Sequence, residues 1–282
     1  MEDRFNTFLV LCRLLNYRRT AEELNLSQPA VTKQIQGIER DYGVKLFSYE
    51  SRKLSLTKEG MIVENHAKAL AFNDQDLRVK LRKPAGRMLR IGATKSIGDF
   101  LLAPYLESWI SEASHQLSLT VDNTQRLLQM LDDAMIDFAF VEGFFNKGRY
   151  AYRVLVQEPF TGICSLDHPF RGKEVDVSQL KGQTLLVREK GSGTRDMLEH
   201  ALNAMGEDLD VFSRIITSSS LHVIKSLARK NLGISFVYET VAKSDSTLST
   251  FNVKGMSSSH DFSAVWIDGT GSRKDLDDFL KI

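Results

Sequence analysis

The sequence predicts an α/β protein with a small N-terminal helical domain, one long helix, and a larger two-part α/β domain. Three observations support this organisation of the 282 residues. Residues 5–38 carry apolar side chains at helical spacing on three short segments, and residues 58–81 have the pattern of one long helix. From residue 88 onward, apolar runs typical of strands alternate with amphipathic helical segments, which indicates a parallel sheet.

The three N-terminal segments are expected to pack as a trihelical unit. Ser27 has the position of an N-cap and Pro29 lies in the first turn, so the third helix should begin near Gln28. Gly43 should end this helix. The apolar positions of the three segments are Phe5, Phe8, Leu9, Cys12 and Leu15, then Ala21 and Leu24, then Ala30, Val31, Ile35 and Ile38.

The outward side of the third helix has the composition of a helix that contacts DNA. Gln28, Thr32, Lys33 and Gln36 offer amide, hydroxyl and ammonium groups that can reach base edges and phosphates. Residues 52–56 are expected to form a short β wing with phosphate-binding cations, and Thr57 should cap the next helix. Taken alone, the segment could also be an ordinary helical hairpin with a polar face.

The order of these motifs resembles the winged helix-turn-helix of LysR-type transcriptional regulators. The motifs are a first helix with paired Phe residues, the run Ala21-Glu-Glu-Leu-Asn-Leu-Ser-Gln-Pro-Ala-Val-Thr-Lys-Gln-Ile35, and then Ile38-Glu39, Gly43, Leu46-Phe47 and Leu56-Thr57. Thr20 and Tyr49 depart from the family pattern, which usually has Ala and Arg there. The expected DNA-contacting residues are Ser27, Gln28, Pro29, Thr32, Lys33, Gln36, Arg52 and Lys53.

The long helix has the spacing of a dimerisation helix. Val63, Leu70 and Leu77 fall seven residues apart, with His66 and Asn73 between them, although these two could simply be half-exposed polar residues. Residues 84–86, Pro-Ala-Gly, should end this helix. The resemblance implies a winged helix-turn-helix at 1–57, a linker helix and hinge at 58–86, and an effector-binding domain at 87–282.

The effector-binding domain is expected to consist of two lobes, as in the periplasmic-binding-protein-like (type 2) fold of the same family. Lobe I would hold about 87–160 and 265–282, and lobe II about 161–264, with residues 153–164 crossing between them. The expected strands are 88–93, 117–121, 138–141, 184–187, 214–217, 233–237 and 264–267, and the expected helices are 97–110, 127–134, 194–205, 221–229 and 274–280.

In such a fold a ligand binds between the lobes, where strand ends meet helix N-termini. Three segments there place hydroxyls at the start of a helix, Thr94-Lys95-Ser96, Gly191-Ser-Gly-Thr-Arg195 and Ser218-Ser-Ser220, and together they suit a small anionic effector. The candidate residues are Thr94, Ser96, Ser192, Gly193, Thr194, Arg195 and Ser219. Ser96 and Ser219 could instead be helix caps only.

Composition excludes several other classes of protein. The formal net charge of +1 says little about partners, and no long apolar segment predicts a membrane span, so a cytoplasmic location is expected. Cys12 and Cys164 are expected to be buried, with a redox role for Cys164 as the alternative. No catalytic constellation, metal-ligand spacing or cofactor motif stands out, and Glu158, His168 and His200 are isolated.

The expected function is therefore that of a bacterial LysR-type regulator, not an enzyme. It would bind double-stranded promoter DNA as a homodimer or homotetramer and respond to a small, anionic metabolite. A small-molecule receptor or an enzyme on the same α/β scaffold remain alternatives.

Overall fold

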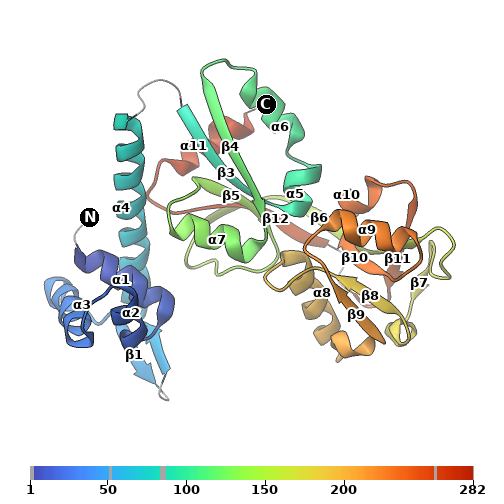
Figure 1. Ribbon diagram of the computed structural model, residues 1–282, viewed down its shortest axis with the longest axis horizontal. Coiled ribbons are helices and arrows are strands. Elements are labelled where there is room, and N and C mark those ends of the chain that lie inside the picture. The colour runs from blue at the N-terminus through green and yellow to red at the C-terminus, as the bar shows by residue number, and fades with distance from the viewer. Residues whose placement is uncertain (1–2, 51–52, 83–86, 257–258, 282) are drawn as a thin grey trace.

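Figure 1 shows a computed structural model of the chain, which describes residues 3–50, 53–82, 87–256 and 259–281. The N-terminal helical unit leads into the long helix α4 (Lys58–Arg82), which lies beside the first of two α/β lobes. The predicted wing residue Arg52 and the predicted helix break at 84–86 lie outside the described residues. No helix of the described part of the chain is long and apolar enough to cross a membrane.

The N-terminal unit consists of α1 (Asp3–Leu14), α2 (Tyr17–Glu23) and α3 (Gln28–Tyr42). The predicted start of α3 is confirmed, because Ser27 Oγ accepts a hydrogen bond from the Ala30 amide at 3.3 Å. Gly43 ends α3 in the left-handed conformation, at a φ of 69°. The prediction for Leu15 was wrong: α1 ends one residue earlier, and Leu15 is exposed rather than part of the apolar stripe.

A two-stranded wing follows α3, and it begins earlier than the sequence indicated. Strand β1 (Phe47–Glu50) pairs with β2 (Lys53–Leu56) in antiparallel register. Thr57 caps α4 as predicted, because its Oγ1 accepts from the Gly60 amide at 2.9 Å. The same hydroxyl donates to the Lys45 carbonyl at 2.6 Å, which ties the start of α4 to the segment after α3.

Lobe I is built on a sheet in which β3 (Arg87–Thr94) lies between β4 (His115–Asp122) and β5 (Phe138–Glu142), all parallel. β12 (Ser259–Trp266) adds antiparallel to β5, so the end of the chain returns to this lobe as predicted. Successive residues of β5 point to opposite faces. Phe138 and Phe140 pack under α6 (Ala103–Ile110) and α11 (Ser272–Leu280), whereas Ala139 and Val141 pack under α7 (Thr124–Asp132).

The prediction of one helix over residues 97–110 was wrong. The structure has α5 (Lys95–Phe100) and α6, separated by Leu101 and Leu102. Pro104 lies in the first turn of α6, where its missing amide hydrogen does no harm, but its ring would clash with a continuous preceding turn.

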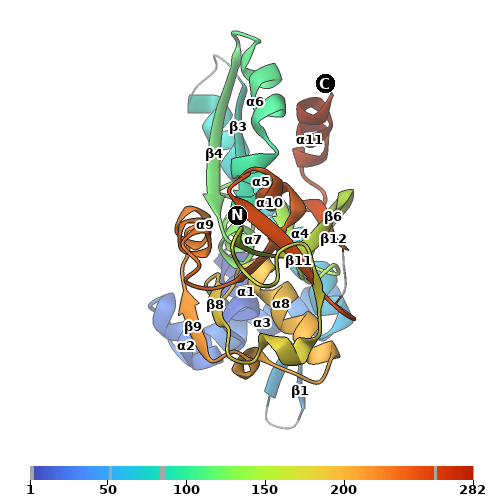
Figure 2. The same cartoon turned by 90° about the vertical axis from the view of Figure 1, so that its right-hand side faces the viewer.

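Lobe II is reached by β6 (Ala151–Ser165), the predicted crossover. Its first part pairs with β12, and its last residues pair with β10 (Ser235–Tyr238) and with β11 (Leu248–Val253). β11 also pairs with the short strand β7 (Glu174–Val175). β8 (Thr184–Val187) runs parallel to β9 (Arg214–Thr217). α8 (Gly193–Ala204) and α9 (Leu221–Arg229) cover opposite faces of β8, as Figure 2 shows.

Several short elements of lobe II were not expected from the sequence. They are β7, β11, the helix α10 (Glu239–Lys243), and the 3-10 turns Val177–Leu180 and Leu209–Val211. Elements of two to six residues carry too few positions for a periodic pattern to stand out.

Candidate functional site

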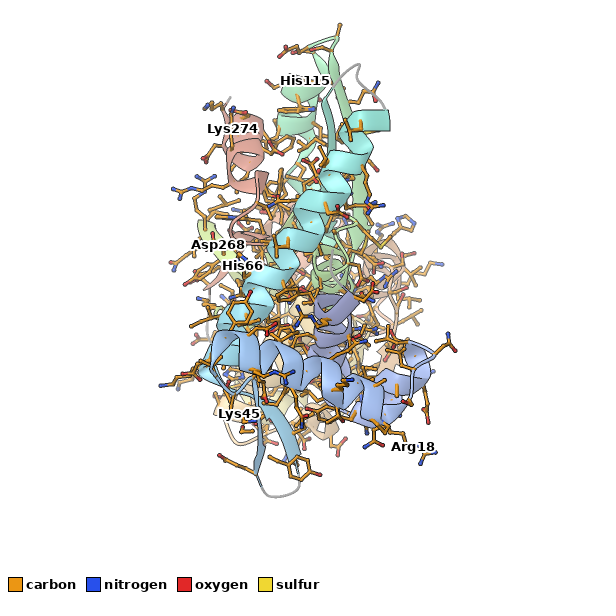
Figure 3. The ribbon with its side chains drawn as sticks, turned by 90° about the vertical axis from the view of Figure 1, so that its left-hand side faces the viewer. Arg18, Lys45, His66, His115, Asp268 and Lys274 are labelled. Atoms are coloured by element: carbon orange, nitrogen blue, oxygen red, sulfur yellow. The ribbon has the colours of Figure 1, made fainter. Side chains whose placement is uncertain are left out.

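The outer side of α3 presents the polar residues that the sequence assigned to DNA. Gln28, Lys33 and Gln36 are exposed, and Thr32 is half-buried with its Oγ1 donating to the Gln28 carbonyl at 3.1 Å. The amide and ammonium groups at three positions are therefore free to reach base edges or phosphates. Figure 3 shows α3 lying across the view, with the labelled Arg18 and Lys45 toward its two sides and the wing projecting below.

The two positions that depart from the family pattern are both accommodated. Thr20 is fully buried, and its hydroxyl donates to the Asn16 carbonyl at 2.9 Å, so the extra polar atom has a partner. Tyr49 on β1 is 71% exposed, and Lys53, at the start of β2, is exposed as well. Tyr49 pairs with Leu54 and Lys53 with Glu50, so the wing presents the aromatic ring and the cation on opposite faces.

Three of the predicted cleft residues come together around one carboxyl group that the sequence did not single out. Thr94 ends β3 and donates to Glu142 at 3.2 Å, and Ser96 donates to the same side chain at 3.2 Å. Thr194, on α8 of the other lobe, donates to Glu142 at 2.7 Å. Hydroxyls of both lobes therefore converge on Glu142, at the carboxyl end of β5.

Among the described residues, no cation is in direct contact with this carboxyl group. Glu142 is 1% exposed, and burial raises its pKa, although the hydroxyl hydrogen bonds and the positive charge of Arg188 act in the opposite direction. Thr124 fixes the backbone at the same point, because its hydroxyl donates to the Glu142 carbonyl at 2.9 Å.

Two glycines let the lobes approach each other at this point. A Cβ added to Gly193 would lie 2.3 Å from the Glu142 carbonyl oxygen, and one added to Gly143 would lie 2.6 Å from the Gly193 Cα. Gly143 also has a φ of 83°, which side chains rarely allow. Gly193, a predicted site residue, is thus placed where α8 meets the end of β5.

The remaining predicted cleft residues have other surroundings. Ser192 precedes α8, and its buried Oγ has no hydrogen-bond partner among the described residues. Arg195 donates to Glu199 at 2.7 Å and to the Arg188 carbonyl at 3.3 Å, and within the described part of the chain it makes no hydrogen bond to Glu142. Ser219 accepts a hydrogen bond from Lys95 through its carbonyl, and the cap of α9 is its neighbour Ser220.

Sequence reasoning missed two groups in this region, Glu142 and Arg188. Arg188 follows β8, is 3% exposed, and donates to Glu189 at 2.8 Å, while its Nη1 has no partner in the described part of the chain. Burial alone would raise the pKa of Glu189, but the hydrogen bonds from Arg188 hold it below the ordinary value. Both missed residues stand at strand ends, which is the signal that could have found them.

The two cysteines are buried, as predicted. Burial raises the pKa of Cys164 to about 11 and that of Cys12 further, so both are neutral thiols at neutral pH. The alternative of a redox role for Cys164 is disfavoured, because the reactive species would be a thiolate.

A second cluster of charged groups joins α4 to lobe I. Lys68 Nζ lies 3.1 Å from Glu64 Oε1 and 2.6 Å from Asp132 Oδ1, and Arg149 donates to Glu64. Tyr150 donates to Asp132 at 3.1 Å. Glu64 and Lys68 are both buried, so this junction between the linker helix and the lobe is ionic.

Comparison with known proteins gives matches over both parts of the chain. Residues 3–61 match the family described as "Bacterial regulatory helix-turn-helix protein, lysR family", and residues 82–282 match "LysR substrate binding domain". The HTH-type transcriptional regulator CysL of Bacillus subtilis is 26% identical over 249 residues, covering 86% of this chain and 82% of that protein. CbbR of Rhodospirillum rubrum is 32% identical over 235 residues, covering 82% and 76%.

A solved structure agrees on the fold. A mutant of Corynebacterium glutamicum OxyR bound to H2O2 superposes with a TM-score of 0.60 at 20% identity, covering 98% of this chain and 89% of that one. The relatives are named transcriptional regulators rather than enzymes. The chain therefore belongs to the LysR family of transcriptional regulators, with a helix-turn-helix domain followed by an effector-binding domain.

Proposed function

We propose that this regulator binds promoter DNA as a dimer or tetramer through α3 and the wing, and that a small anionic metabolite in the interlobe cleft controls this binding. The observation that carries the DNA-binding part is the exposed outer side of α3, where the side chains of Gln28, Lys33 and Gln36 make no hydrogen bond to the described residues. Ser27, Pro29, Thr32, Arg52 and Lys53 complete the proposed surface. A protein that acts on promoters would work in the cytoplasm.

An exposed apolar stripe on α4 supports the dimer. The stripe consists of the exposed residues Ile62, Leu70, Leu77 and Leu81, at spacings that keep them on one side of the helix. Val63 instead packs into the helix-turn-helix core, so the stripe begins one residue earlier than the sequence indicated. His66 is exposed, and Asn73 donates to the Gly269 carbonyl of the same chain at 3.4 Å.

Unpaired donors in the cleft support an anionic effector. Ser192 Oγ and Arg188 Nη1 are buried without partners in the described part of the chain, next to the N-terminus of the twelve-residue helix α8. Lys95, from the other lobe, brings a second cation to this region. An anion bound here would accept hydrogen bonds from both donors. It would also be attracted to the N-terminus of α8, where the helix dipole is positive. Lobe closure on the anion would then shift the angle between paired DNA-binding domains.

The DNA-binding part is tested by mapping bound sites genome-wide and then measuring binding to one such site by fluorescence anisotropy. Gln28→Ala should weaken binding to that site by about 1 to 3 kcal/mol while leaving random DNA unaffected, because it removes a base contact. Lys33→Ala should weaken binding to the mapped site and to random DNA alike. It should also reduce the slope of log affinity against log salt concentration by about 1, because one phosphate contact is lost.

Lys243→Ala, on the exposed surface of lobe II, is the matched control and should bind like the wild type. Equal binding to mapped sites and random DNA by the wild type, or unchanged binding after Gln28→Ala, would contradict the proposal.

A further inference from the structure

The hydroxyl cluster of the cleft is already occupied by a side chain of the protein. Thr94 and Ser96 of lobe I and Thr194 of lobe II all donate to the Glu142 carboxyl group, at 3.2, 3.2 and 2.7 Å. These are the hydroxyls that would otherwise be available to an anion between the lobes. An anion held by Ser192 Oγ and Arg188 Nη1, which are unpaired among the described residues, would also need these hydroxyls, and Glu142 occupies them.

The described residues around Glu142 do not compensate its charge by direct contact with a cation. From the end of β8, Arg188 is engaged with Glu189, and from α5, Lys95 donates to the Ser219 carbonyl. From the end of β10, Tyr238 faces Glu142 with a buried hydroxyl that has no partner among the described residues, and its pKa is raised well above the ordinary value by burial and then by Glu142. On α8, the negative charge of Asp196 acts on Tyr238, and Arg195 is paired with Glu199.

An anion and an ionised Glu142 would repel each other strongly in this buried site, where little water screens them. Protonation of Glu142 removes the repulsion and leaves the side chain able to donate one hydrogen bond. Burial of the carboxyl group makes this neutral form easier to reach than for an exposed glutamate.

We propose that Glu142 is an internal competitor for the effector, so that an anion binds the cleft hydroxyls only when Glu142 is protonated. Glu142 therefore takes up one proton from solvent for each anion that binds. This inference rests on the proposed anionic effector and adds its regulation by pH. Glu142 then sets a threshold: the regulator responds to its anion more strongly as the pH falls.

Sulfate is a suitable probe, because its charge stays constant between about pH 5.5 and 8, so any pH dependence belongs to the protein. Calorimetric titration of the full chain with sulfate, in two buffers of different ionisation enthalpy, measures proton uptake directly. We expect about one proton per sulfate, and a dissociation constant that rises about tenfold per pH unit above the pKa of Glu142. Binding without proton uptake would overturn the inference, and so would absence of sulfate binding at every pH.

Glu142→Gln provides the second measurement, because the amide is neutral at every pH. This variant should bind sulfate with no pH dependence, and more tightly than the wild type at about pH 8. The matched control is Asp99→Asn, since burial also raises the pKa of this α5 carboxyl group but it makes no bond to the cluster hydroxyls in the described contacts. Asp99→Asn should keep the wild-type pH dependence.

Two results would contradict the role of Glu142: an unchanged pH dependence in Glu142→Gln, or its loss in Asp99→Asn. Promoter binding measured on the same samples separates the two proposals. Intact, site-specific DNA binding with pH-independent sulfate binding would reject only the competitor role, whereas loss of specific DNA binding in the wild type would reject the proposed function.

Discussion

Glu64 and Glu142 are both buried glutamates at junctions between parts of the chain, but their partners differ in kind. Glu64, on α4, lies 3.1 Å from Lys68 and also accepts from Arg149, so it is neutralised by cations. Glu142, between the lobes, accepts from three neutral hydroxyls. The charge of a carboxylate paired with cations is balanced by them, whereas that of a carboxylate among hydroxyls is removed only when a proton binds. The surroundings of Glu64 therefore suit a rigid contact between α4 and lobe I, and those of Glu142 suit a site whose charge changes.

The largest expected effect comes from Lys68→Met, which removes a cation shared by Glu64 and Asp132. Removing one partner of a buried ion pair leaves uncompensated charge, so we expect a loss of about 3 to 5 kcal/mol in the free energy of unfolding. Urea unfolding followed by the fluorescence of Trp109 and Trp266, both in lobe I, measures it.

Lys243→Met is the control for this experiment, because its pair with Glu239 is exposed, and removing it should cost less than about 0.5 kcal/mol. Similar losses in the two variants would show that the buried junction does not behave as an ion-pair network.

The second prediction is that the same substitution, Glu to Gln, changes the free energy of unfolding in opposite directions at Glu64 and Glu142. Glu64→Gln should lower the free energy of unfolding by about 2 kcal/mol, since Lys68 and Arg149 lose one anionic partner and keep only Asp132. Glu142→Gln should raise it at neutral pH, by roughly 1 kcal/mol, because a buried carboxylate becomes a neutral amide.

The sign for Glu142 follows from its raised pKa. The folded protein holds the Glu142 proton more tightly than the unfolded chain does. The contribution of Glu142 to the free energy of unfolding is therefore fully present below its ordinary, unfolded-state pKa, and it is lost as the pH rises through its raised, folded-state pKa. The advantage of Glu142→Gln should therefore appear in thermal melts only as the pH increases. An advantage that is largest in acid would contradict the assignment.

The smallest expected effect is that of Tyr150→Phe. Its hydroxyl donates to Asp132 at 3.1 Å, but Asp132 keeps Lys68 as a partner. We expect a loss of about 1 kcal/mol, the usual value for one hydrogen bond, measured by the same urea unfolding. A loss as large as that of Lys68→Met would mean that the hydroxyl, rather than the cation, holds the junction together.

The helix-turn-helix was predictable because its signals are local. Ser27, Pro29 and Gly43 act within one turn of the helix ends that they define, and the structure places all three as expected. The break between α5 and α6 was missed although Pro104 marks it, because apolar spacing continues across it. The stripe on α4 was displaced by one residue, since Val63 and Ile62 are equally apolar and only packing distinguishes them.

The candidate cleft was predictable only in part, for a related reason. Thr94, Ser96 and Thr194 were found because hydroxyls at helix starts form a recognisable pattern. Glu142 was not found, because its position at a strand end is a weak signal when its partners, which lie 46 to 52 positions away, are not known. The same holds for Glu64 and Lys68, which look like an ordinary exposed pair on a helix until lobe I covers them.

The sequence by itself determined the family, the order of the domains and the helix that presents polar groups to DNA, because these depend on short-range caps, turns and periodicity. Only the tertiary structure decided which charges are buried and what neutralises them. Burial depends on surfaces brought together from distant parts of the chain, and it is burial that makes Glu64 part of an ionic junction and makes Glu142 a group that one proton can switch.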